Sequence, residues 1–131
     1  MNLIRNIILA FFLFLFLSCE NFYMSSIIND AANPIVVKVK MDKIAIAKQR
    51  REYIKKGFLV SDEEPKDYEV KINPAESYEF EGRLHSRPDF YDIKEIEIYS
   101  GDTLILKCRK DQLLKLFSTE TSPGCFDLII K

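Results

Sequence analysis

The chain lacks most of the residues from which catalytic and metal sites are built, since its 131 residues include one histidine, His85, and three cysteines. Zinc sites and histidine-assisted nucleophiles need several such groups together. The acidic run at residues 62–64 lacks the alternate spacing and the glycine turn of a calcium loop. Glu79 and Glu81 could flank a glycosidic bond, but two glutamates on one strand are more typical of a solvated sheet face. We therefore expect no enzymatic activity, no cofactor and no metal site.

The sequence also has no excess of positive or negative charge, and it has no long apolar run. Its 19 basic and 20 acidic residues are balanced, which does not indicate nucleic-acid binding. The longest apolar run, residues 7–17, has eleven residues. As a helix this run would span roughly 16 Å, about half of a ~30 Å bilayer core, so it favours an export signal over a transmembrane helix.

The end of this run resembles the lipobox of bacterial lipoproteins, in its relaxed spirochaete-like form. Phe16 and Leu17 are followed by the small residue Ser18 and then by Cys19. Phe16 stands where leucine is usual, and Ser18 stands where alanine or glycine is usual. The resemblance covers the leader only. It implies that residues 1–18 are a signal peptide and that Cys19 is acylated, which would hold the protein on the bilayer almost permanently. An ordinary secretory signal and an uncleaved anchor remain alternatives.

Cleavage of 18 residues from 131 would leave a mature chain of 113, enough for one domain. Residues 19–33 show no sustained period of 2 or 3.6, and we interpret them as a lipidated tether. In the alternative interpretation, Ile27 and Ile28 dock on the domain. Residues 34–131 are then expected to form one globular domain that is rich in β-structure.

Alternating apolar and polar residues predict most of this domain to be β-structure. A first strand is expected over 34–40. One hairpin is expected over 67–84, with a type I turn at 73–76 that has Pro74 at its second position, and another over 93–108. A short helix at 112–117, capped by Asp111, would precede a last strand at 125–130. The predicted fold class is mainly β: a single antiparallel β-sandwich or partly open barrel, of about six or seven strands, with one inserted helix and one short helix.

The inserted helix is expected from Asp42 as N-cap to about residue 56, with Gly57 after its end. Its apolar residues share one face, as in a helix packed on a sheet. A strand over 43–47 is the alternative. The other face carries basic residues that form a possible anionic-ligand patch or a plain solvated face. These residues are Lys48, Arg51, Lys55 and Lys56.

With Cys19 committed to lipid, an exported chain would have two further cysteines in an oxidising compartment. We therefore expect a disulfide between Cys108 and Cys125, worth about 3 kcal/mol if unstrained. The alternative is two buried thiols.

The leader and the missing catalytic residues together favour a non-enzymatic lipoprotein of the cell envelope. We expect its partners to be the lipid bilayer, through acylated Cys19, and an envelope protein that contacts the loops at 84–92 and 119–124. The alternative is a host-facing adhesin whose basic helix face contacts anionic glycans or a host protein.

Overall fold

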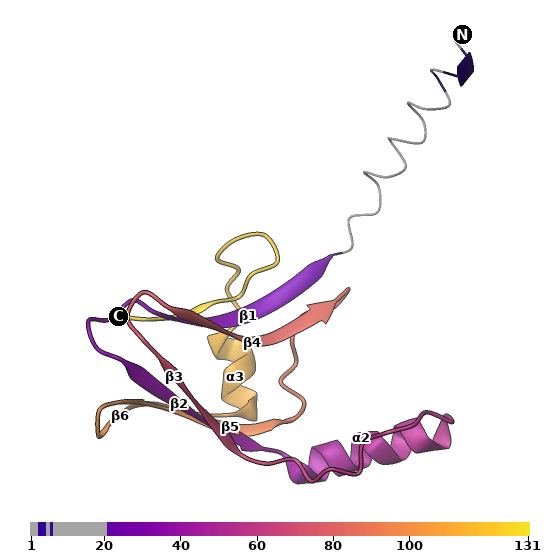
Figure 1. The fold of residues 1–131 in the computed structure, drawn as a ribbon, viewed down its shortest axis with the longest axis horizontal. Helices are drawn as coiled ribbons and strands as arrows, with labels where there is room; N and C mark the ends of the chain where they lie inside the picture. Colours follow the sequence, from indigo (N-terminus) through magenta and orange to yellow (C-terminus); the bar gives the residue numbers. More distant parts are fainter. Residues whose placement is uncertain (1–2, 5, 7–20) are drawn as a thin grey trace.

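A computed structural model of the chain describes residues 3–4, 6 and 21–131, so the predicted cleavage site and Cys19 lie outside the described residues (Figure 1). Seven strands of the described part form two sheets. In chain order, the elements are β1 (Phe22–Asn29), β2 (Ile35–Met41), α2 (Lys43–Lys55), β3 (Tyr68–Ile72), β4 (Ser77–Leu84), β5 (Ile93–Ser100), β6 (Thr103–Arg109), α3 (Lys110–Leu116) and β7 (Leu128–Ile130).

The two sheets have the strand orders β4-β1-β7 and β3-β2-β5-β6. All neighbouring strands are antiparallel except β1 and β7, which are parallel. The sheets face each other, and α3 lies between them while α2 projects away (Figure 1). The predicted mainly-β, sandwich-like fold is confirmed, and neither sheet closes into a barrel.

The core lies between the sheets. On β2 the buried residues Ile35, Val37 and Val39 alternate with half-buried Val36 and with exposed Lys38 and Lys40, as expected for a strand with one solvated face. An aromatic group joins β4 to the end of α3, with ring centroids 5.1–5.8 Å apart among Phe80, Phe90 and Phe117. The main core residues are Ile27, Ile35, Val37, Val39, Ile72, Phe90, Ile93, Ile96, Ile98, Cys108, Leu113, Phe117 and Phe126.

The predicted tether over 19–33 is wrong from Phe22 onward. Residues Phe22–Asn29 form β1, the central strand of the three-stranded sheet, between β4 and β7. Ser25, Ile27 and Asn29 are fully buried. Because two of these three inward residues are polar, the strand shows no hydrophobic alternation in the sequence. The docking alternative is confirmed for Ile27, and the domain begins at about Phe22 rather than at residue 34.

The first predicted hairpin is also wrong, although both of its strands exist. β3 pairs with β2, whereas β4 pairs with β1, so the turn between them crosses from one sheet to the other. The amide of Glu76 donates to the carbonyl of Asn73 over 3.1 Å, closing the turn. Ala75, its third residue, has a φ of 63°, which belongs to a type II turn and not to the predicted type I. The second hairpin, β5–β6, is confirmed.

The structure contradicts the predicted disulfide, because Cys108 and Cys125 are both free thiols. Cys108 is buried on β6 in the four-stranded sheet, opposite Ile96. Cys125 lies before β7 and forms an isolated backbone β-bridge with Met24 of β1, in the three-stranded sheet. The expected adjacency fails because the predicted last strand begins later, at Leu128, and belongs to the opposite sheet.

Candidate functional site

The base of α2 is fixed to the domain by a small polar cluster. Asp42 caps the helix by accepting a hydrogen bond from the Ala45 amide over 3.0 Å. The ammonium of Lys110, at the start of α3, donates to Asp42 over 2.7 Å and to the Tyr91 carbonyl over 2.6 Å. The hydrogen bond from Lys110, followed by that from Ala45, lowers the pKa of Asp42. The predicted helix and its cap are therefore confirmed, whereas the N-cap of α3 is Arg109 and not the predicted Asp111.

Beyond its first turn, α2 does not pack on a sheet as predicted, but projects from the domain (Figure 1). Ile46 is the buried residue of this helix, whereas Ile44 is 83% exposed and Ile54 is 58% exposed. The inner face of the four-stranded sheet is already covered by the other sheet and by α3, and its outer face is charged. A helical pattern shows which residues share a face, but not whether a sheet is free to receive them.

The chain after α2 returns alongside the helix. The guanidinium of Arg50 donates to the Glu63 carbonyl over 2.7 Å, and Lys43 forms an ion pair with Glu64 at 2.8 Å. The contact between Lys43 and Glu64 raises the pKa of Lys43 and lowers the pKa of Glu64. A shallow, polar cleft of about 510 Å³ lies between helix and returning chain. Its lining residues are Arg50, Ser61, Glu63, Glu64, Pro65 and Lys66.

Among the described residues, the contacts from Glu63 and Glu64 reach Arg50 and Lys43 and not the end of α2. In the basic patch (Lys48, Arg51, Lys55 and Lys56), the ion pair found among the described residues joins Lys55 to Glu52 at 3.4 Å, and both side chains are more than half exposed. Such a pair contributes little stability. The basic patch is solvent-exposed and carries a net positive charge.

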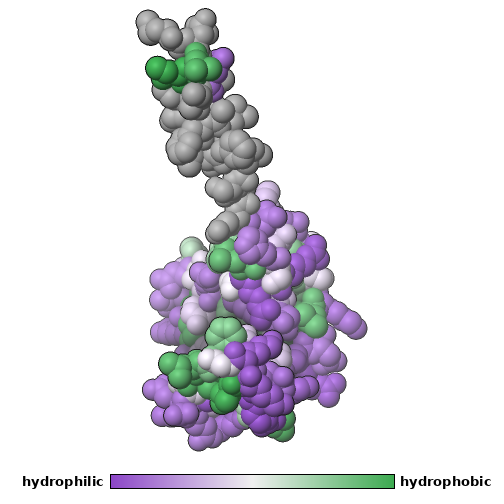
Figure 2. Space-filling model, turned by 90° about the vertical axis from the view of Figure 1, so that its right-hand side faces the viewer, coloured by the Kyte–Doolittle hydropathy of each residue, from purple (hydrophilic) through white to green (hydrophobic). Residues whose placement is uncertain are grey.

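An apolar group lies beside the basic patch at the free end of α2. We call these residues the α2 tip: Tyr53, Ile54, Phe58 and Leu59. Leu59 is fully exposed and Phe58 is 61% exposed. The rings of Tyr53 and Phe58 meet edge to face, with centroids 5.9 Å apart, and the Phe58 amide donates to the Tyr53 carbonyl over 3.0 Å. Figure 2, which faces the side toward which α2 points, shows hydrophobic surface gathered among hydrophilic residues there.

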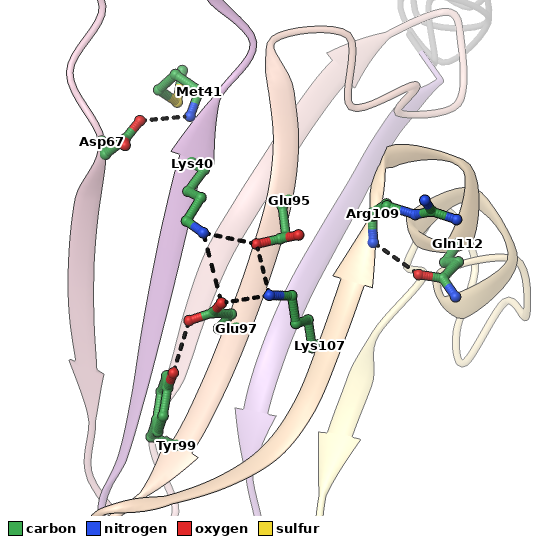
Figure 3. A network of polar contacts seen from close by, with 9 residues as sticks. All are labelled: Lys40, Met41, Asp67, Glu95, Glu97, Tyr99, Lys107, Arg109 and Gln112. Carbon is green, nitrogen blue, oxygen red and sulfur yellow. Dashed lines mark hydrogen bonds and ion pairs between the residues drawn. The ribbon is translucent and has the colours of Figure 1, made fainter.

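A second charged feature covers the outer face of the four-stranded sheet (Figure 3). Lys40 of β2 contacts Glu95 at 2.9 Å, and Lys107 of β6 contacts Glu97 at 3.1 Å. Two longer pairs, at 3.7 and 3.4 Å, cross-link them into one network. The Tyr99 hydroxyl donates to Glu97 over 2.8 Å.

This ionic network stabilises its own charges. The hydrogen bonds from Tyr99 and then Lys107 lower the pKa of Glu97 to about 2. The Lys40 contact likewise lowers the pKa of Glu95, and the two carboxylates raise the pKa values of both lysines. Because every carboxylate here is already paired with a cation, the network offers neither a general base nor a free anionic site at neutral pH. It is a solvated structural face.

The other candidate residues of the sequence lie on β4 and in the loop that follows it. Glu79 is exposed, whereas Glu81 is half-buried and accepts hydrogen bonds from the Phe90 amide at 2.9 Å and from Arg83 at 3.0 Å. Burial raises the pKa of Glu81. His85 lies in the loop after β4 with a φ of 63°. Over residues 3–4, 6 and 21–131, no group of three His, Cys, Asp or Glu side chains could hold a metal ion.

Comparisons with protein-family models, with curated proteins and with solved structures gave no match. In the described part, no helix is both long enough and apolar enough to cross a membrane.

Sequence reasoning found the basic patch but missed its apolar neighbour. Ile54 and Tyr53 were expected to face a sheet, and Phe58 and Leu59 follow the helix where no pattern assigns them a surface. The sequence signal that could have separated Phe58 and Leu59 from the helix was Gly57. Its φ of 84° ends the helix, so that the two residues after it leave the helix axis. The ionic network was also missed, although the lysines of β2 and the glutamates of β5 each alternate with apolar residues.

Proposed function

We propose that the protein is a lipid-anchored lipoprotein of the bacterial cell envelope that acts as a binding or structural module rather than as an enzyme. The observation that carries this proposal is the leader, an eleven-residue apolar run that ends in Phe16, Leu17, Ser18 and Cys19. The folded domain begins only three residues after Cys19, at Phe22, which suits a protein whose amino terminus is held at a bilayer.

The chemistry of the described residues supports a non-enzymatic role. Asp42 serves as a helix cap, and Glu95 and Glu97 are members of the ionic network. General acid–base catalysis needs a group that can exchange a proton near neutral pH and reach a substrate. The pKa of Asp42 is lowered by the hydrogen bond from Lys110, that of Glu95 by the hydrogen bond from Lys40, and that of Glu97 by the hydrogen bonds from Tyr99 and then Lys107.

The test is the intact mass and the detergent partitioning of the protein from its native cells, with a Cys19→Ala variant as control. We expect the wild type to lose residues 1–18, to gain the mass of acyl chains and to enter the detergent phase. The variant should do none of these. If both proteins have the same processed mass and stay in the aqueous phase, the leader is an ordinary secretory signal and the proposal is wrong.

Exposure of the basic patch favours a second candidate, a host-facing adhesin that binds anionic glycans or a host protein. Lys48, Arg51 and Lys56 are all exposed at the projecting part of α2. Protease treatment of intact cells separates the two roles. Removal of the protein would support outward exposure, whereas protection until the outer membrane is breached would exclude the adhesin.

A further inference from the structure

The amino end of the domain and the free end of α2 lie on the same side of the molecule. In Figure 1, β1 begins on the right-hand side, and α2 points toward that side as well. β4 ends beside the start of β1, because Phe22 and Leu84 are partners in the antiparallel register. Phe22 is 48% exposed and Leu84 is 53% exposed. This side of the domain therefore presents apolar groups at two places, next to the chain start and at the α2 tip.

The short chain before β1 limits how far this side can lie from an anchor. Three residue steps separate Cys19 from Phe22. A fully extended chain covers at most ~3.3–3.6 Å per residue, so the start of β1 lies within about 10 Å of an acylated Cys19. A flexible spacer over residues 20–33 would have allowed roughly 20 Å. Because β1 replaces that spacer, an acylated Cys19 would hold the domain against the bilayer by the side that lies on the right in Figure 1.

The α2 tip and the basic patch together match the surface of an anionic bilayer. Leu59 and Phe58 extend into solvent, and the basic residues lie on the last turns of the same helix. Surface-bound helices place aromatic and aliphatic residues at the acyl boundary and basic residues among the lipid phosphates. A sulfated glycan would match the basic residues but would leave the apolar tip in water.

We infer that α2 is a second membrane contact, in which Phe58 and Leu59 enter the headgroup region of an anionic bilayer and the basic patch pairs with lipid phosphates. This inference rests on the proposed lipid anchor, which brings α2 within reach of the bilayer. The contact fixes the orientation of the domain, so that the β5–β6 turn, on the left in Figure 1, points away from the membrane.

The absence of tryptophan from the chain allows a direct test. A Phe58→Trp variant carries a single reporter at the α2 tip. Ile105→Trp is the matched control, because Ile105 is 43% exposed and is the third residue of β6, which begins on the opposite side of the domain. Each acylated protein is reconstituted into phosphatidylglycerol-containing vesicles with either ordinary or brominated acyl chains.

We expect brominated lipid to remove most of the fluorescence of the Phe58→Trp protein and to shift its remaining emission to the blue, while the Ile105→Trp control keeps its emission. Reversing the basic patch in the Phe58→Trp protein, with glutamate at all four positions, should restore most of the fluorescence. These side chains are exposed, so the fold is expected to persist, and circular dichroism checks it.

Vesicle flotation distinguishes failure of the anchor from failure of this inference. If the acylated proteins do not float with the vesicles, the proposed lipid anchor is wrong. If they float but the two tryptophan variants are quenched equally little, the anchor holds and the α2 contact is wrong. If the Phe58→Trp emission changes only when a soluble sulfated polysaccharide is added, α2 binds glycan instead of lipid and the inference is overturned.

Discussion

Asn29 offers the sharpest test of whether β1 belongs to the domain. It is fully buried at the end of β1. Its side-chain amide donates to the carbonyls of Asn33 over 2.9 Å and Ile72 over 3.0 Å, and its side-chain oxygen accepts from the Ala31 amide over 3.1 Å. These three bonds fasten the β1–β2 connection to the end of β3. In a flexible tether, Asn29 would have no such partners.

Replacing Asn29 by aspartate keeps the shape of the side chain but removes both donors. Two carbonyl oxygens then lose their partner, at about 1–3 kcal/mol each, and a carboxylate faces them without a cation. We expect the Asn29→Asp variant to lose about 3–5 kcal/mol of unfolding free energy at neutral pH, a large part of the roughly 5–15 kcal/mol that stabilises a typical domain. The same substitution at exposed Asn33 is the control, with an expected change within about 0.5 kcal/mol.

The pH dependence of Asn29→Asp gives an independent sign to check. An unfolded aspartate has a pKa of about 3.9, and burial opposite two carbonyls should raise its pKa in the folded variant. The folded variant then binds the proton more tightly than the unfolded chain, so its unfolding free energy falls as pH rises above about 4. The protonated side chain can still donate one hydrogen bond. Urea unfolding at several pH values measures this, and a variant as stable as wild type at neutral pH would refute the structural role of β1.

Three further predictions concern other parts of the fold. Gly124→Ala should destabilise the protein more than Gly101→Ala in urea unfolding, by about 1–3 kcal/mol: both glycines have a positive φ, but a Cβ on Gly124 would lie 2.5 Å from a backbone oxygen of β1, and equal losses would contradict that close approach. Tyr99→Phe should raise the pKa of Glu97 from about 2, as followed by carboxyl NMR. Because a depressed carboxyl pKa contributes stability above the ordinary value of 4.5 that is lost as pH falls toward 2, the variant should also lose less stability between those values; an unchanged pKa would mean that Lys107 alone sets it. In urea without reductant, the two thiols of the described chain should both be alkylated, and in the folded protein Cys108 should react the more slowly, because burial raises its pKa; resistance to alkylation in urea would restore the disulfide.

The parts of the fold that the sequence predicts correctly depend on short-range interactions. The β5–β6 hairpin has alternating strands and a tight turn at Gly101, all within seventeen consecutive residues, 93–109. Helix α2 has its cap at Asp42 and its stop at Gly57. Each of these signals acts over a few residues, so neither element requires knowledge of the rest of the chain.

The errors occur where an element depends on distant partners. β3 and β4 look like a hairpin because they are adjacent and joined by a turn at Pro74. Each strand instead pairs with a strand from the first part of the chain, β2 or β1. β1 itself was unrecognised because the polar groups of Ser25 and Asn29 occupy inward positions, which hydrophobic periodicity cannot detect.

The candidate site divides along the same line. That Lys48, Arg51, Lys55 and Lys56 would be exposed follows from their helical spacing. The helical spacing does not predict that apolar residues are exposed beside them, because an apolar helix face is normally buried against another part of the fold. Within the part of the chain that the structure describes, these apolar residues find no such partner, since α3 and the second sheet already cover the inner face of the sheet from which α2 departs.

The position of β1 also changes which surfaces a soluble partner could reach. The loop at 84–92 begins beside the chain start, because the His85 amide donates to the Asn21 carbonyl over 2.8 Å. The loop at 119–124 is held there as well, since the Met24 amide donates to the Gly124 carbonyl over 2.8 Å. If Cys19 is acylated as proposed, both loops would lie near the bilayer and not at the far end of a tether. A partner approaching from solution would meet the β5–β6 turn and the ionic network of the four-stranded sheet, whose paired charges give it a polar surface rather than an apolar one. Binding there would therefore depend on shape and hydrogen bonding, and would weaken little with added salt, whereas the α2 contact with anionic lipid should weaken strongly.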